Sequence, residues 1–194
     1  MARAVEIQRE GRVFRGFVSI DEAVLRHERF AGGWTRPLTR IKVERGDSAA
    51  AIVTSVETGR VILVEQFRYP TLAGAGGWIV ETVAGVVGPG ETPEEAIRRE
   101  VREEIGYDPR SLEHIATFYA SPGAATERIF LYWAQVTEVA RGGRIEDDDE
   151  EDIALREYTP EALWAALDGG ELVDGKTIIA AMWLRTRLSR AADS

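Results

Sequence analysis

The sequence predicts an α/β or α+β protein built in layers, with a small β unit ahead of the main domain. The chain has 194 residues, of which 44% are hydrophobic, and this is enough to bury a sizeable core. Apolar runs typical of strands are interspersed with segments that carry the start and stop signals of helices. A boundary near Glu44–Asp47 would divide an N-terminal β unit, residues 1–45, from a main domain, residues 46–194.

Strands are expected throughout the first third of the chain. Residues 4–30 contain short β-rich runs that are broken by glycine and charge, and residues 39–70 contain runs joined by a turn at Glu57–Arg60. Val61–Phe67 is nearly all apolar, which is typical of a strand covered on both faces.

Later elements follow in the same mixed order. Residues 72–78 are rich in glycine and predict a loop, and residues 78–85 predict one further strand. Two strands are expected around a loop at Ser121–Thr126. Residues 159–170 carry a threonine cap, a proline at the first helical position and a glycine stop, and residues 177–188 predict a last amphipathic helix.

The helix with the strongest signals is expected at Pro93–Ile105. Thr92 and Glu95 form a capping box, Pro93 lies at the first helical position, and Gly106 supplies the stop. Its buried stripe consists of apolar residues four positions apart: Ile97, Val101 and Ile105.

Composition and charge exclude several classes of function. The formal net charge is −9, but the acids of Glu146–Asp152 are consecutive, and without these seven the net charge would be −2. An acidic surface disfavours a nucleic-acid partner, although it allows a phosphate substrate when a metal ion mediates. The absence of cysteine excludes disulfides and thiolate metal sites and fits a cytoplasmic protein. We expect no signal peptide and no membrane helix.

Three glutamates on the capped helix require an explanation. Glu100, Glu103 and Glu104 share one face, where like charges weaken a helix. One interpretation is a solvated surface with ion pairs to nearby arginines: Arg98, Arg99 and Arg102. The other is a site for Mg²⁺ or Mn²⁺, which prefer hard oxygen ligands.

The wider pattern around these glutamates favours the metal site. It runs G-x5-E-x7-R-E-U-x-E-E-x-G-U, where U is a bulky apolar residue. The matching positions are Gly85, Glu91, Arg99, Glu100, Val101, Glu103, Glu104, Gly106 and Tyr107. This pattern resembles the Nudix box of the Nudix hydrolase family, with Tyr107 where an aliphatic residue is commoner. Flanking segments such as "VILVEQFR", "ETVAG", "YASPG", "EEDI" and "DGKTIIA" resemble the nucleoside diphosphate sugar branch of that family.

The resemblance implies a fold, an activity and an assembly. The fold would be the Nudix α/β/α sandwich with a mixed sheet, and the N-terminal β unit would make the protein a homodimer. The activity would be metal-dependent hydrolysis of the pyrophosphate bond of a nucleotide sugar. Pro122 resembles the mark of ADP-ribose pyrophosphatases, so the expected reaction converts ADP-ribose to AMP and ribose 5-phosphate.

The resemblance also implies how two to three metal ions, Mg²⁺ or possibly Mn²⁺, would be held at each site. Glu103 and Glu104 would be the main ligands, with Glu100 as another and the backbone carbonyl of Ala84 completing the shell. Arg99 would hold the carboxylates in place from behind.

In this branch the general base often lies on a later loop. The end of the acid run Glu146–Asp152 resembles this loop, and the resemblance places Asp149 and Glu151 at the functional positions, with Glu151 also a metal ligand. Glu150 or Glu151 could serve as the base in place of Asp149. Asp149 stands where the branch usually has glutamate. A merely solvated acidic loop is the alternative interpretation.

Three residues resemble substrate contacts elsewhere in the branch. Arg68 would lie near the substrate phosphates, Glu127 near the distal sugar, and Arg40 would reach the site of the partner subunit. For Arg68 and Glu127 a structural or surface role is an equal alternative.

Three rival functions remain open or are rejected. GDP-mannose hydrolysis stays open, because "GGW", "SPGAATE" and "DGKT" also resemble enzymes of that activity. A catalytically silent nucleotide sensor is disfavoured by the intact glutamates. A P-loop at residues 170–177 is rejected, because a helix precedes it and acids occupy the phosphate cradle.

Overall fold

The computed structural model describes residues 3–137 and 152–192. These residues form two compact units, one within Met1–Asp47 and Tyr119–Arg128 and the other within Ser48–Phe118 and Ile129–Ser194. They are called the N-terminal unit and the main unit below. The N-terminal unit also includes Tyr119–Arg128. The expected division at residue 45 did not include this segment.

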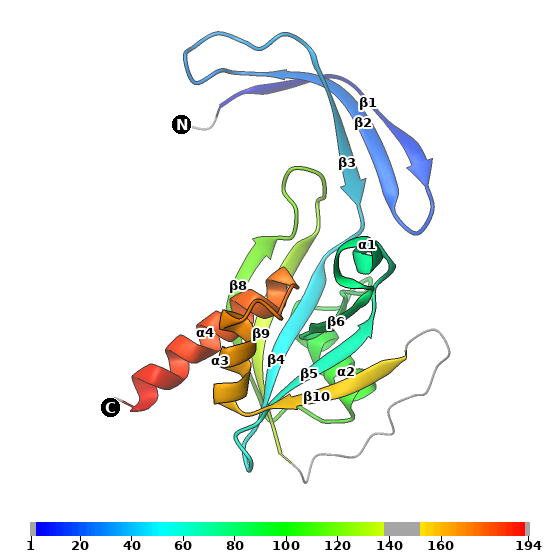
Figure 1. The fold of residues 1–194 in the computed structure, drawn as a ribbon. Coiled ribbons are helices and arrows are strands. Elements are labelled where there is room, and N and C mark those ends of the chain that lie inside the picture. The colour runs from blue at the N-terminus through cyan, green and yellow to red at the C-terminus, as the bar shows by residue number, and fades with distance from the viewer. Residues whose placement is uncertain (1–2, 138–151, 193–194) are drawn as a thin grey trace. The chain divides into compact units, whose positions relative to one another are not determined.

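The N-terminal unit is a three-stranded antiparallel sheet in the order β1-β2-β3 (Figure 1). Its strands are β1 (Val5–Arg15), β2 (Ser19–His27) and β3 (Leu38–Glu44). Short runs broken by glycine and charge were expected here, but β1 continues through Gly11, with two register shifts in its pairing with β2. Thr126 N donates to Val43 O over 3.0 Å, which fixes residues 119–128 to β3.

The main unit contains a mixed seven-stranded sheet with the order β10-β5-β4-β9-β8, in which β6 pairs with β5 and β7 with β4. The strands are β4 (Ser48–Ser55), β5 (Val61–Phe67), β6 (Trp78–Glu81), β7 (Val83–Val86), β8 (Ser111–Tyr119), β9 (Arg128–Val136) and β10 (Ile153–Tyr158). β4 and β9 are parallel, whereas β5 is antiparallel to β10, β4 and β6. The sheet is mixed, as predicted.

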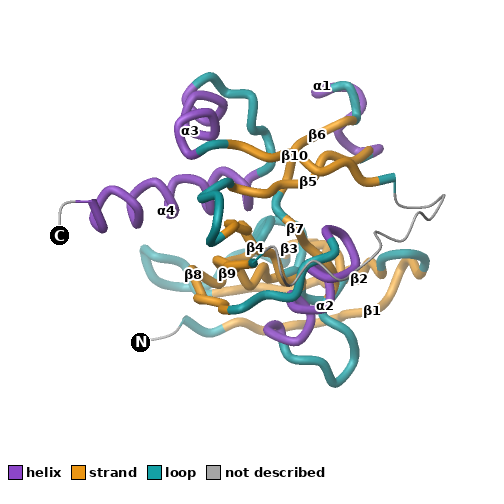
Figure 2. The backbone as a smooth tube through the Cα atoms, turned by 90° about the horizontal axis from the view of Figure 1, so that it is seen from below, coloured by secondary structure: helices purple, strands orange, loops and turns teal. Residues whose placement is uncertain are grey.

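Helices cover both faces of this sheet, because β4 is apolar on both sides. Ala49, Ala51 and Val53 belong to a core shared with α2 (Pro93–Ile105). Ala50 and Ile52 belong to a second core shared with α3 (Pro160–Asp168) and α4 (Gly175–Ala192). Figure 2 shows α2 on one side of the strands and α4 on the other. The predicted α/β/α sandwich is confirmed.

The centre of the sheet is split between β4 and β5. These strands pair directly only at Val53–Thr54 with Val61–Ile62. Beyond that point β5 pairs with β6, and β4 pairs with β7. Thr82 lies at the corner between β6 and β7. The single strand expected at residues 78–85 is therefore wrong, because the chain changes partner strand at Thr82.

Two helices also differ from expectation. Leu72–Ala75 forms a short helix, α1, after the 3₁₀ turn Tyr69–Thr71, and the predicted loop is limited to Gly76 and Gly77. These two glycines have φ of 74° and 87°, which other residues rarely adopt. α4 begins two residues before the predicted start and continues to Ala192. None of the helices in the described ranges is long and apolar enough to cross a membrane.

Candidate active site

Helix α2 has the ends and the buried face that its sequence predicts. Thr92 Oγ1 accepts a hydrogen bond from Glu95 N, and the Glu95 carboxylate accepts one from Thr92 N over 2.8 Å. Gly106 ends the helix with φ of 74°. The predicted stripe residues Ile97, Val101 and Ile105 are all buried. The capping box and the stripe therefore fix how far the helix is rotated about its axis.

Arg99, in the middle of this helix, contacts three carboxylates. Its Nε and Nη2 donate to the two oxygens of Glu91 over 3.1 and 3.2 Å. Its Nη1 donates to Glu100 Oε1 over 2.6 Å and to Glu103 Oε2 over 2.9 Å. These hydrogen bonds, led by the one with Glu91, raise the pKa of Arg99 further above its ordinary value.

Glu91 ties the loop before α2 to this arginine. One of its oxygens also accepts a hydrogen bond from Gly88 N over 2.9 Å. The hydrogen bonds from Arg99 and then from Gly88 lower the pKa of Glu91 below its ordinary value. Glu91 is therefore a charged, bidentate anchor for the loop, and this geometry suits a structural role.

The three clustered glutamates differ in exposure. The side chain of Glu103 is 53% exposed and that of Glu100 is 13% exposed, whereas Glu104 is buried at 6%. Glu100 lies against β7 at Gly85, where a Cβ atom would overlap its carboxylate. A glycine at this position of the box is required for space, because any side chain would displace Glu100.

The backbone carbonyl proposed as a further ligand belongs to the same strand. Ala84 lies in β7 directly before Gly85 and pairs with Ala50 of β4. β7 packs on α2, so Ala84, Gly85 and the glutamates are parts of one strand–helix assembly.

The donor chemistry of this assembly fits divalent ions. The three glutamates and a backbone carbonyl are hard oxygen donors, and Gly85 leaves room for the Glu100 carboxylate. Within residues 3–137 and 152–192, no three histidine or acidic side chains converge as a ready metal site. Instead, Glu100 and Glu103 both contact Nη1 of Arg99.

A second polar cluster of the main unit was not foreseen from the sequence. Glu81, at the end of β6, is 2% exposed. Its Oε1 accepts from Arg68 Nε over 2.6 Å, and its Oε2 contacts Lys176 Nζ. Lys176 Nζ also lies 3.1 Å from Asp174 Oδ2. The segments "ETVAG" and "DGKT" were noted, but nothing in the sequence indicates that they meet.

The same cluster fixes the corner at Thr82. Thr82 N donates to Thr177 Oγ1 over 2.8 Å, and Thr177 Oγ1 donates to Asp174 Oδ2 over 2.6 Å. Thr177 N also donates to Asp174 Oδ2 over 3.0 Å. Asp174 therefore takes the amide at the start of α4, where a P-loop would hold a phosphate.

Two further candidate residues belong to the N-terminal unit. Arg40 lies on β3, is exposed, and donates through Nη1 to the carbonyl of Thr39 over 2.9 Å. Glu127 lies 3.9 Å from Arg45.

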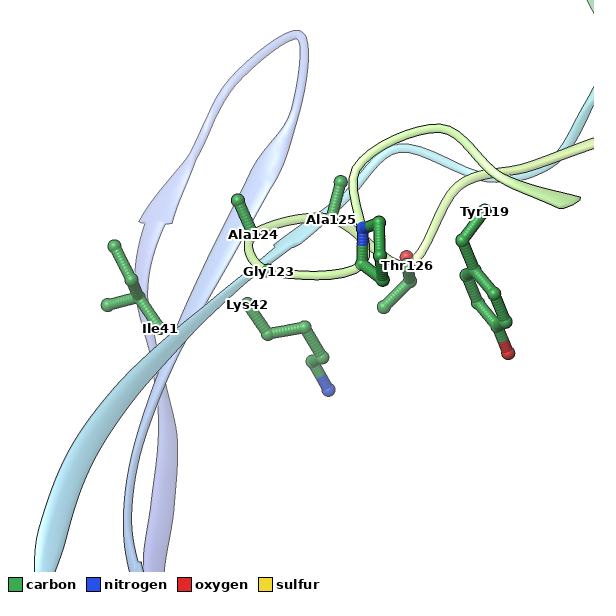
Figure 3. A pocket seen from close by; sticks show the side chains of 8 residues that line it. Ile41, Lys42, Tyr119, Gly123, Ala124, Ala125 and Thr126 are labelled. Atoms are coloured by element: carbon green, nitrogen blue, oxygen red, sulfur yellow. The ribbon is translucent and has the colours of Figure 1, made fainter.

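Both residues are adjacent in sequence to a pocket of about 350 Å³ in this unit (Figure 3). Ile41 and Lys42 of β3 line the pocket together with the loop residues 122–126. The volume is at the lower end of the range for small-molecule sites. The last three candidates, Asp149, Glu150 and Glu151, lie outside the described residues.

Comparisons with known proteins identify the family of the chain. A family model described as the NUDIX domain matches residues 44–180. An ADP-ribose pyrophosphatase from Haemophilus influenzae is 30% identical over 195 residues, which cover 98% of this chain and 90% of that protein. The ADP-ribose pyrophosphatase of Escherichia coli K12 is 31% identical over 183 residues, covering 93% and 88%.

Two other comparisons concern substrate and fold. A GDP-mannose pyrophosphatase from Pectobacterium atrosepticum is 37% identical over 153 residues, covering 76% of this chain and 77% of that protein. The crystal structure of an ADP compounds hydrolase has a TM-score of 0.74 at 17% identity, covering 98% and 97% of the two chains. At this identity the structural match concerns the fold alone.

Proposed function

The chain belongs to the Nudix family, and from that premise we propose that it hydrolyses the pyrophosphate bond of a nucleoside diphosphate sugar. Nudix hydrolases generally use divalent metal ions. The favoured substrate is ADP-ribose, with AMP and ribose 5-phosphate as products. The observation that carries the proposal is the carboxylate cluster of α2, in which Arg99 contacts Glu91, Glu100 and Glu103.

The proposed ligands are Glu100, Glu103 and Glu104 with the carbonyl of Ala84, holding two to three Mg²⁺ ions, or Mn²⁺ in their place. When bound, these ions neutralise the diphosphate and lower the pKa of the attacking water. Arg99 donates to Glu91 through Nε and Nη2 and to Glu100 and Glu103 through Nη1, and Glu100 and Glu103 would hold the ions in place of their contact with Nη1.

The other proposed roles concern substrate and proton. Arg68 binds a phosphate, and Glu127 and Arg40 contact the substrate away from its phosphates, Arg40 across a homodimer. An acid among Asp149, Glu150 and Glu151 accepts the proton of the attacking water, and Glu151 also serves as a metal ligand. The water oxygen then bonds to one phosphorus as the bridging P–O bond breaks.

GDP-mannose is the second candidate substrate. Its support is the relative with that named activity, which is 37% identical, against 30% and 31% for the two ADP-ribose pyrophosphatases. The higher identity extends over a shorter stretch, so coverage favours ADP-ribose and identity favours GDP-mannose.

A substrate panel tests the proposal. ADP-ribose, GDP-mannose, UDP-glucose and ADP are each incubated with the protein and Mg²⁺, and phosphate is measured after phosphatase treatment of the products. We expect the highest kcat/KM for ADP-ribose. A higher value for GDP-mannose would select the second candidate, and no turnover of any nucleotide sugar would refute the proposal.

Substitutions within Glu146–Asp152 test which residue is the general base. Glu151→Gln is expected to lower kcat strongly with a smaller effect on KM, because the lost group acts mainly in the transition state. Glu146→Gln, in the same run but outside the resembling segment, is the control. If neither Glu151→Gln, Glu150→Gln nor Asp149→Asn lowers kcat, the base lies elsewhere.

We also propose a cytoplasmic homodimer formed through the N-terminal unit. β1 is an edge strand of 11 residues, all of them exposed, and such an edge invites pairing with another chain. The unit also exposes large apolar side chains: Val5, Ile7, Val13, Phe14, Phe17, Phe30 and Ile41.

The assembly is tested on this edge. Ile7→Lys should shift the protein from dimer to monomer in sedimentation velocity, because a charge replaces an exposed apolar side chain of β1. Gln8→Lys, the next residue on the same strand, should remain dimeric. A wild-type protein that sediments as a monomer would contradict the proposal.

A further inference from the structure

In the main unit, Arg68, Glu81, Lys176 and Asp174 form a chain of alternating charges joined by three ion pairs. We propose that Glu81 is a positioning residue, which holds the guanidinium of Arg68 in the orientation that binds a substrate phosphate. The proposal rests on the hydrolysis proposed above, because Arg68 requires an anionic ligand to act on.

The burial of Glu81 makes its two ion pairs obligatory. Its side chain is only 3% exposed, and a buried carboxylate is costly unless charged partners satisfy it. Each oxygen has one partner, with Arg68 on Oε1 and Lys176 on Oε2. The carboxylate is therefore fixed from two sides, and it cannot rotate without breaking an ion pair.

Arg68 is the end of this chain of charges that is available to a ligand. Its side chain is 41% exposed, and it gives Nε to Glu81. In the part of the chain that the structure describes, no group accepts a hydrogen bond from its Nη1 or Nη2. These two nitrogens carry four N–H donors in a planar fork that matches phosphate oxygens. A guanidinium already held by Nε loses less conformational entropy when it binds.

Lys176 determines how Glu81 shares its charge. It comes from the first turn of α4, 95 residues after Glu81 in sequence. Because Lys176 takes Oε2, Glu81 offers Arg68 a single oxygen rather than a bidentate partner. Asp174 balances Lys176 in turn, so the four charges cancel and the terminal nitrogens of Arg68 remain for a ligand.

A double-mutant cycle tests this assignment. Glu81→Gln and Arg68→Ala should each weaken binding of inorganic pyrophosphate, measured by titration calorimetry, by about 10-fold or more, since hydrogen bonds to charged groups are worth about 1.5–3 kcal/mol. The double variant should bind like Arg68→Ala alone, because Glu81 acts only through Arg68. Additive losses would overturn the proposal.

The same cycle is measured as kcat/KM with the nucleotide sugar that the wild type hydrolyses best. Asp168→Asn is the matched control, because it breaks an ion pair to α4 at Arg185, far along the helix, and should change neither readout. If the wild type hydrolyses no nucleotide sugar, the proposed function fails, while pyrophosphate binding still decides the role of Glu81.

A second variant covers a failure of Glu81→Gln to fold. Glu81→Leu with Lys176→Met replaces the buried ion pair by apolar side chains, an exchange that often preserves stability. On this background Arg68→Ala should cause no further loss of pyrophosphate binding. A further loss equal to that seen in the wild type would show that Arg68 works without Glu81.

Discussion

Two charge clusters of this protein differ in whether cations and carboxylates are equal in number. In the N-terminal unit, Arg12 lies 2.7 Å from Asp21, and Lys42 lies 3.3 Å from Asp21 and 3.2 Å from Glu10, so two cations meet two carboxylates. On α2, the guanidinium of Arg99 alone contacts three carboxylates. The first arrangement is complete by itself, whereas the second leaves negative charge that divalent ions can neutralise.

This difference separates a structural cluster from a candidate metal site more clearly than acid content does. Both clusters combine acids with bases and contain hydrogen bonds shorter than 2.8 Å. Only the α2 cluster combines surplus carboxylates with an adjacent glycine that makes room for one of them, Gly85. Breaking each cluster should therefore have different consequences.

The largest expected effect comes from the α2 cluster. Glu103→Gln should lower kcat/KM by about 10²-fold or more, because a metal ligand loses its charge. The side chain is 53% exposed, so the variant should fold normally. Glu94→Gln is the control on the same helix, since Glu94 pairs with Arg98 on the surface. Near-normal activity of Glu103→Gln at saturating Mg²⁺ would contradict the metal assignment.

Divalent ions should stabilise the protein through the surplus charge. At 100 times its dissociation constant, a ligand adds about 2.7 kcal/mol, which corresponds to a rise in Tm of roughly 5–10 °C for a chain of this size. Thermal melts with and without Mg²⁺ measure this rise. Glu103→Gln should reduce it, and an unchanged response in that variant would place the ions elsewhere.

Breaking the balanced cluster should affect stability alone. Arg12→Met removes the main partner of Asp21, which is 9% exposed, and leaves it with Lys42. We expect a lower Tm, with a change smaller than the Mg²⁺-dependent rise, and an unchanged response to Mg²⁺. A loss of the Mg²⁺ response in Arg12→Met would show that the two clusters are coupled.

Acid should weaken both clusters, and we expect its effect to be the smallest of the four predicted here. Arg12 chiefly holds the pKa of Asp21 below its ordinary value, and Arg99 does the same for Glu91. A carboxylate with a lowered folded-state pKa stabilises the protein fully above its unfolded pKa, near 4. That stabilisation is lost as pH falls from there through the lowered value. Melts between about pH 5 and 3 should show the decline, and Arg12→Met or Glu91→Gln should flatten it.

Local signals made much of the fold predictable. The bounds of α2 were predicted correctly because Thr92, Glu95 and Gly106 act within a few residues of one another. The coverage of β5 on both faces followed from its nearly continuous apolar sequence. The corner at Thr82 could not be predicted, because residues 78–81 and 83–86 are equally strand-like. The change of partner there depends on β4 and β5 diverging.

The candidate site divides in the same way. The grouping of the α2 glutamates was predictable, because residues three and four positions apart on a helix lie on the same face. The contacts of Glu81 were not, because Arg68 and Lys176 reach it from 13 and 95 residues away. Exposure was also unpredictable: Glu104 is buried and Glu103 is not, although they are neighbours on the same helix.

The order of strands in the sheet has a consequence for synthesis of the chain. β10 covers the outer edge of β5, yet Arg156 of β10 and its partner Glu65 are 91 residues apart. On a ribosome, β5 emerges long before the strand that protects it, so its backbone edge stays open while the intervening residues are made. A chain that stops before Ile153 would leave the strand Val61–Phe67, with its apolar run Val61–Val64, unprotected, and we expect such a chain to aggregate.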